Sequence, residues 1–136
     1  MGLLAAVPTL GRMKRWFWIL DALVVIVFVI IGREDHGFDS GIGDYVRVAA
    51  PFLVALVVSI VAFRAWRNPT DWRTGAFLAV GTVVLGMLLR RFVWDAGTAR
   101  TFIVVTTAFL VAGMVGWRLV ASVAGRILAN RRPAAA

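Results

Sequence analysis

Four long apolar stretches fill most of this 136-residue chain, and each is close to the length of a membrane crossing. A helix needs about 20 mostly apolar residues to cross roughly 30 Å of hydrocarbon. In lipid every backbone polar group must be paired within the protein, so only helices and closed barrels can span. Barrel strands alternate apolar and polar residues, whereas residues 23–31 are apolar without interruption. The apolar stretches are residues 16–31, 46–63, 75–89 and 102–121.

The composition supports the same conclusion. Hydrophobic residues make up 61% of the chain and charged residues 16%, and the mean hydropathy is +0.87. A soluble domain needs more polar residues than this to cover its surface. The sequence therefore predicts an all-α, polytopic membrane protein: one domain over residues 1–136, with four transmembrane helices in a compact bundle. We expect the helices at about 16–32, 46–66, 74–94 and 101–123, and a flexible tail over 127–136.

Basic residues are distributed unevenly between the connections of the predicted helices. The formal net charge is +8, from 15 Lys and Arg against 7 Asp and Glu. In a soluble protein such an excess indicates a nucleic-acid partner, but in a membrane protein it marks the cytoplasmic side. With four crossings, both terminal flanks and the second connection share one side, and that side carries the Lys/Arg excess. We therefore expect a multi-pass protein of the cell (plasma) membrane, with both termini cytoplasmic and no nucleic-acid partner.

Small residues line one face of the third predicted helix. Gly75, Ala79, Thr82 and Gly86 follow one another at spacings of four, three and four residues. Lipid gives helices no hydrophobic reason to associate, so residues that permit close approach are important for packing. The face predicts close helix packing, within the bundle or in a homodimer or larger membrane complex. A substrate groove lined by small residues is the alternative interpretation.

Two charged residues lie inside apolar stretches. Asp21 is about 7–8 Å past Trp16, and Arg118 is about 12 Å from Arg126, at 1.5 Å per helical residue. An unpaired charge at depth costs roughly 2.5–3.5 kcal/mol, so Asp21 and Arg118 are expected to pair. Arg64 is a less suitable partner because it lies nearer a helix end and can reach water. The pair is either a structural contact that sets helix register, or a proton or ion relay, or an anion site.

Two further groups of polar residues are candidates at the outer face. Arg90 shares the small-residue face with Gly86 and could bind an anionic headgroup or pair with an acid of the outer loop. Arg33, Asp35 and His36 lie in the first outer connection, where the only histidine of the chain stands among carboxylates. This cluster could hold a divalent metal, sense pH or form a solvated acidic loop. The sequence assigns no cofactor and no catalytic residue, and the absence of cysteine excludes thiolate chemistry and disulfides.

Several short elements follow one another along the chain: Asp21, Phe28, Gly32–Arg33, His36–Gly37, Pro51–Leu53, Gly86 to Arg90, Phe102, Val104–Val105 and Trp117–Arg118. This series resembles an uncharacterised family of small bacterial and archaeal membrane proteins, the domain of unknown function family 3054. The resemblance covers roughly residues 16–120 and implies four helices and a membrane location, but no activity. One departure is Val54–Ala55, where some members are expected to have a Gly-Trp pair.

Two functions from different classes fit these observations. The first is a non-enzymatic integral membrane protein, acting as a partner subunit or as part of a small-solute or ion pathway. The alternative is a membrane-embedded enzyme or lipid-binding protein that uses the outer-face Arg/His/carboxylate cluster. An enzyme needs a nucleophile or an acid–base set within hydrogen-bonding reach, and only His36 with the neighbouring acids could supply one.

Overall fold

The protein is all-helical in the part of the chain that the computed structural model describes, residues 7–34 and 41–131, with side chains described over 16–32 and 41–131. Three of the four helices, α2 to α4, are long and apolar enough to cross a membrane. The apolar part of α1 is shorter, over Trp16–Gly32. The helices are α1 (Val7–Glu34), α2 (Ile42–Ala62), α3 (Trp72–Phe92) and α4 (Arg100–Asn130).

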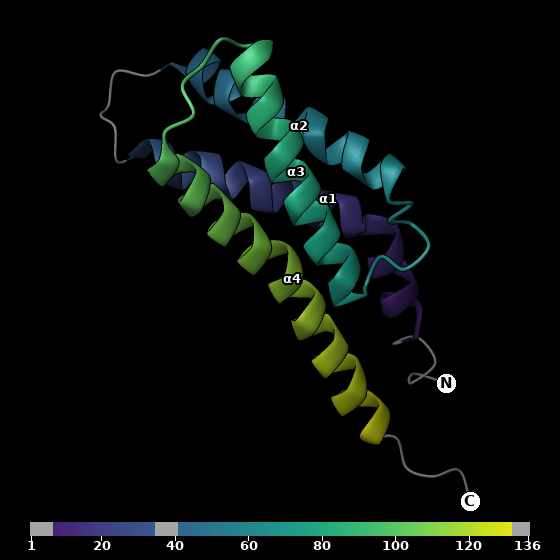
Figure 1. Ribbon diagram of the computed structural model, residues 1–136. Coiled ribbons are helices and arrows are strands. Elements are labelled where there is room, and N and C mark those ends of the chain that lie inside the picture. The colour runs from purple at the N-terminus through teal and green to yellow at the C-terminus, as the bar shows by residue number, and fades with distance from the viewer. Residues whose placement is uncertain (1–6, 35–40, 132–136) are drawn as a thin grey trace, which may run out of the picture.

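The four helices form a ring in which each helix packs against its two neighbours along the chain, and α4 returns to α1 (Figure 1). Contacts are most extensive between α2 and α3 and between α3 and α4, and α1 is the least tightly held. The start of α1, the α2–α3 connection and the end of α4 lie at one end of the bundle, which we call the terminal end. The α3–α4 connection lies at the opposite, distal end. Figure 1 also shows α4 projecting beyond α3 at the terminal end.

The second helix ends at Ala62, earlier than the predicted residue 66. Arg64 adopts a left-handed conformation with φ of 51°. Its N–H donates to the carbonyl of Val61 at 3.3 Å, and the N–H of Ala65 donates to that of Ile60 at 3.1 Å. This pair of bonds is the Schellman motif, whose left-handed residue is usually glycine. Because an arginine occupies that position here, the helix end carries no glycine signal in the sequence.

The fourth helix continues through Asn130. The sequence had predicted a flexible tail from residue 127 onwards. Residues 122–130 contain no proline, and their alanine, leucine and arginine favour helix. Gly125 is tolerated within the helix, and the first proline after it is Pro133. A helix can therefore extend beyond the apolar span that the sequence analysis used to place its end. The N-terminus of α3 is capped by Asp71, whose carboxylate accepts from the Arg73 N–H at 3.2 Å.

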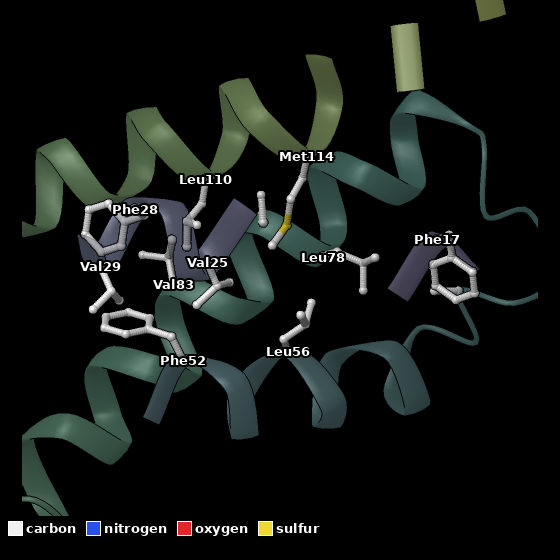
Figure 2. Close-up of a cluster of buried hydrophobic side chains, with 12 residues drawn as sticks. Phe17, Val25, Phe28, Val29, Phe52, Leu56, Leu78, Val83, Leu110 and Met114 are labelled. Atoms are coloured by element: carbon white, nitrogen blue, oxygen red, sulfur yellow. The ribbon is translucent and has the colours of Figure 1, made fainter. Parts of the chain in front are cut away.

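A single apolar core runs the length of the bundle (Figure 2). Leu78 and Met114 lie in its middle, between Phe28 and Phe52 towards one end and Phe17 at the other. In the distal half, Phe28 packs edge-on against Phe52 with ring centroids 6.1 Å apart. Most other large apolar side chains of the four helices are exposed, as expected for surfaces that face hydrocarbon.

Glycines bring the helices close together at specific points. A Cβ atom at Gly86 would lie 2.5 Å from the Phe52 ring, and one at Gly81 would lie 2.7 Å from the Ser59 hydroxyl. At Gly113 of α4 it would lie 2.5 Å from Val24 of α1. The predicted small face of α3 is buried along its whole length, at Gly75, Ala79, Thr82 and Gly86. The face therefore serves packing between helices of the bundle.

Candidate functional site

The two charges predicted to lie inside apolar helices, Asp21 and Arg118, form a bidentate ion pair. Nη1 of Arg118 donates to Oδ1 of Asp21 at 2.8 Å, and Nη2 donates to Oδ2 at 2.7 Å. Both side chains are completely buried. Asp21 belongs to α1 and Arg118 to α4, so the pairing expected from their similar depths is confirmed. The parallel geometry of the two bonds makes this the stronger, directional kind of charge-assisted contact.

Two neighbouring groups complete the hydrogen bonding of this pair. The indole Nε1 of Trp117 donates to Oδ1 of Asp21 at 2.9 Å. Nε of Arg118 donates to the carbonyl of Pro69 at 2.8 Å, and Nη1 also donates to the carbonyl of Met114 at 2.7 Å. All three guanidinium nitrogens therefore bond protein oxygens. Through these bonds the pair joins α1, α4 and the α2–α3 connection at the terminal end of the bundle.

The guanidinium of Arg118 lies between an aromatic ring and a glycine. Its carbon lies 4.3 Å from the ring centroid of Trp117. A Cβ atom at Gly75 would lie 2.8 Å from Cδ of Arg118 and 2.8 Å from the Met114 carbonyl. Any side chain at position 75 would therefore push against the arginine. The first residue of the small face of α3 thus makes room for a charged side chain from α4.

This arrangement is chemically closed. Burying an ion pair is costly unless further hydrogen bonds satisfy the remaining donors and acceptors, and here Trp117, Pro69 and Met114 provide them. Both carboxylate oxygens and all three guanidinium nitrogens already have protein partners. This closed geometry favours the interpretation of a structural contact between α1 and α4 over a relay or an anion site.

Arg90, the candidate at the distal end, contacts the protein's own groups. Its Nε donates to the carbonyl of Gly97 at 2.9 Å, which closes the α3–α4 connection. Its guanidinium carbon lies 4.8 Å from the ring centroid of Phe102. Phe102 in turn packs against the rings of Phe28 and Phe52, at 6.0 and 6.1 Å. Arg90 therefore holds a loop and covers the distal aromatic cluster.

The remaining outer-face candidates are described only in part. Arg33 lies in the last turn of α1, but its side chain lies outside the described residues, as do Asp35 and His36. The metal-site and pH-sensing interpretations of this cluster stay predictions. Among the described residues, no three His, Cys, Asp or Glu side chains gather where they could hold a metal ion.

Trp117, Pro69 and Gly75 are parts of the ion-pair site to which the sequence analysis gave no such role. Trp117 had a usable signal, because a tryptophan deep in an apolar helix needs a partner for its N–H, and Arg118 is its neighbour in the chain. No sequence signal identifies the carbonyl of Pro69 as a partner, because every residue has a backbone carbonyl. Gly75 was assigned to the small face, and only the structure shows that its neighbour is a guanidinium.

A second feature of the molecule is a groove on the surface between α1 and α2. Its distal part has a volume of about 450 Å³ and its terminal part about 330 Å³, and both include Leu53. No polar atom contributes to the lining surface of either part. We call this feature the α1–α2 groove. It is lined by Trp18, Ala22, Ile26, Val29, Ile30, Ile42, Tyr45, Val46, Ala49, Ala50, Leu53, Leu56, Val57, Ile60 and Val61.

Comparison with known proteins agrees with the resemblance noted in the sequence. No curated protein and no solved structure matches the chain. The family model described as protein of unknown function (DUF3054) matches residues 18–121. The match includes α2 and α3 in full, most of α1 and α4, and both members of the buried ion pair. The chain therefore belongs to the DUF3054 family.

Proposed function

We propose that this protein is a non-enzymatic, integral membrane protein that binds another apolar component within the bilayer. One contrast carries the proposal: the buried ion pair is closed and fully hydrogen-bonded, while the α1–α2 groove is open at the surface and wholly apolar. A conducting pathway needs polar groups that water or a solute can reach. A binding subunit needs an apolar surface that lipid or a helix can cover.

The proposal includes four crossings with both termini in the cytoplasm of a cell-membrane protein. The apolar part of α1 has 17 residues over Trp16–Gly32, about 25 Å of helix, and α1 packs along α2 and α4. Tryptophan rings prefer the headgroup level, which supports a membrane boundary at the terminal end. Four half-exposed tryptophans belong to that end: Trp16, Trp18, Trp66 and Trp72.

Because the chain has no cysteine, its topology can be tested with single cysteines at Ser40, Asn68 and Ala134. An impermeant maleimide added to intact cells should label position 40 and leave positions 68 and 134 unlabelled. Labelling at 68 or 134 from outside would contradict the orientation. Labelling of 68 but not 134, or the reverse, would contradict the four crossings.

A proton or ion pathway is the second candidate, and one observation favours it. Ser59 and Thr82 are completely buried, and their hydroxyls have no hydrogen-bond partner among the described residues. Such groups are costly in a dry environment, and a transient water would satisfy them. Proteoliposomes loaded with a pH-sensitive dye separate the two candidates. We expect the same proton leak as in empty liposomes, whereas a flux that Asp21→Asn abolishes would support the pathway.

A further inference from the structure

The α1–α2 groove opens at the terminal end beside the last turn of α2. Ile60 and Val61 belong to its wall. The backbone N–H of Arg64 bonds to the carbonyl of Val61, and that of Ala65 bonds to the carbonyl of Ile60. The backbone of Arg64 is thus in direct contact with the end of the groove, and its side chain is exposed. The backbone of this positively charged residue is thereby fixed next to the terminal end of the groove.

Arg64 adopts a backbone conformation that is unfavourable for arginine. Its φ of 51° lies in the left-handed region, which is sterically disfavoured for every residue with a Cβ and which usually selects glycine at this position. A strained conformation points to a use for the residue that adopts it. No carboxylate in the described part of the chain pairs with its guanidinium. The side chain is therefore free to bind an anion at the mouth.

The wall of the groove suits a flexible chain better than a helix. Close helix association in lipid needs small residues at the contact. The glycines that make close contacts, Gly75, Gly81, Gly86 and Gly113, are all used inside the bundle. The groove contains no glycine, and its alanines are Ala49 and Ala50 in the distal part and Ala22 in the terminal part. The other residues that line the terminal part are bulky, such as Val57 and Ile60.

The length of the groove also fits lipid. From Ile42 to Val61 it follows α2 for about 28 Å, close to the roughly 30 Å thickness of the hydrocarbon core. Its terminal part is therefore about as deep as one leaflet. Trp18 lines this part on α1, at the end where tryptophan marks the headgroup level.

We propose that the terminal part of the α1–α2 groove binds one anionic phospholipid of the adjoining leaflet. An acyl chain lies against Trp18, Val57 and Ile60, and the headgroup phosphate binds the guanidinium of Arg64. The proposal rests on the proposed binding function and specifies its partner. It assigns Arg64 a role as the residue that selects anionic over zwitterionic lipid.

Native mass spectrometry of the protein released from nanodiscs tests this site. The nanodiscs contain equal amounts of dioleoyl phosphatidylglycerol and dioleoyl phosphatidylcholine. We expect one phosphatidylglycerol to be retained at collision energies that remove phosphatidylcholine. Arg64→Asn should lower the ratio of retained phosphatidylglycerol to phosphatidylcholine about fivefold, the loss expected for one arginine at an anionic surface. Asparagine is chosen because it tolerates the left-handed conformation.

Two matched controls separate a site from general attraction. Arg126→Asn removes an exposed charge from α4 at the same end of the molecule and should leave the retention ratio unchanged. Val57→Trp fills the groove and should lower retention of both lipids, whereas Val80→Trp, at a similarly exposed position of α3, should not. Val61→Trp replaces Val57→Trp if that variant does not fold.

The outcomes distinguish failure of this site from failure of the proposed function. Equal losses in Arg64→Asn and Arg126→Asn would overturn the site in favour of a diffuse basic surface. A dimer that forms without retained lipid and is lost in Val57→Trp would overturn the lipid but support binding at the groove. If groove-filling variants change neither lipid retention nor oligomeric state, the site and the proposed binding function both fail.

Discussion

Helix α1 meets its two neighbours in different ways. Against α4 it is held by the Asp21–Arg118 pair and by the close approach of Val24 to Gly113. Against α2 it leaves the apolar α1–α2 groove open along most of its length. In lipid, polar bonds and small residues hold helices together, while apolar surface by itself does not. Helix α1 therefore packs against both neighbours, but its ion pair and its close glycine contact both lie on the α4 side, and its surface towards α2 is left partly uncovered.

The largest loss of stability is expected when one partner of the ion pair between α1 and α4 is removed. Arg118→Met leaves the carboxylate of Asp21 buried without its counter-charge, and such a loss costs about 3–5 kcal/mol of stability. Folded yield and thermal unfolding in a mild detergent measure it. Arg126→Met, which removes an exposed arginine from the same helix, should change stability little. Equal tolerance of both variants would mean that the pair does not hold α1.

A second, smaller loss is expected at the packed face of α3. Gly86→Leu introduces bulk where a Cβ alone would lie 2.5 Å from the Phe52 ring, and overpacking of this kind costs about 3 kcal/mol at the upper end of its usual range. Val84→Leu, at an exposed position of the same helix, is the matched control and should fold as the parent does. If unfolding temperatures of the two variants agree, Gly86 faces lipid.

Trp117→Phe tests the hydrogen bonding around the pair with a moderate expected effect. The variant keeps an aromatic ring beside Arg118 but loses the N–H that bonds Oδ1 of Asp21. Polar contacts inside membranes contribute about 1 kcal/mol on average, and we expect a loss of that size in the free energy of unfolding. Trp66→Phe, at an exposed tryptophan, serves as control. An unchanged stability would show that the indole N–H contributes nothing to the site.

The smallest loss of stability is expected for a substitution in the α1–α2 groove. Val57→Ala removes a side chain that is 60% exposed, and should change stability by less than about 0.5 kcal/mol. Val25→Ala removes a fully buried side chain from α1, and should cost about 1–3 kcal/mol. Both are read from the same unfolding curves in detergent. A loss at Val57 as large as that at Val25 would indicate that the α1–α2 seam is as tightly packed as the core.

The ion pair and the small-residue face of α3 could be predicted from the sequence because a few strong physical constraints determine them. A charge inside lipid must find a partner, so similar depths were enough to pair Asp21 with Arg118. Helical spacing placed Gly75 and Gly86 on one face, and both are buried. The four helices followed in the same way from the apolar stretches.

Other features could not be predicted because they depend on geometry without a sequence signal. The end of α2 is set by a left-handed arginine in place of the usual glycine, so the predicted helix extended to residue 66. The α1–α2 groove forms where side chains of α1 and α2 do not contact each other. These side chains are as apolar as their buried neighbours, so the sequence does not distinguish the two groups. The bond from Arg118 to the Pro69 carbonyl depends on where a connection folds.

A double-mutant cycle measures whether Asp21 and Arg118 stabilise the fold as a pair. The free energy of unfolding is measured for Asp21→Asn, Arg118→Met and the double variant. Removing both charges leaves no buried unpaired ion, and asparagine can still accept from Trp117. We expect the double variant to be more stable than the sum of the single losses implies, by about 1 kcal/mol or more. Strict additivity of the two single losses would contradict it.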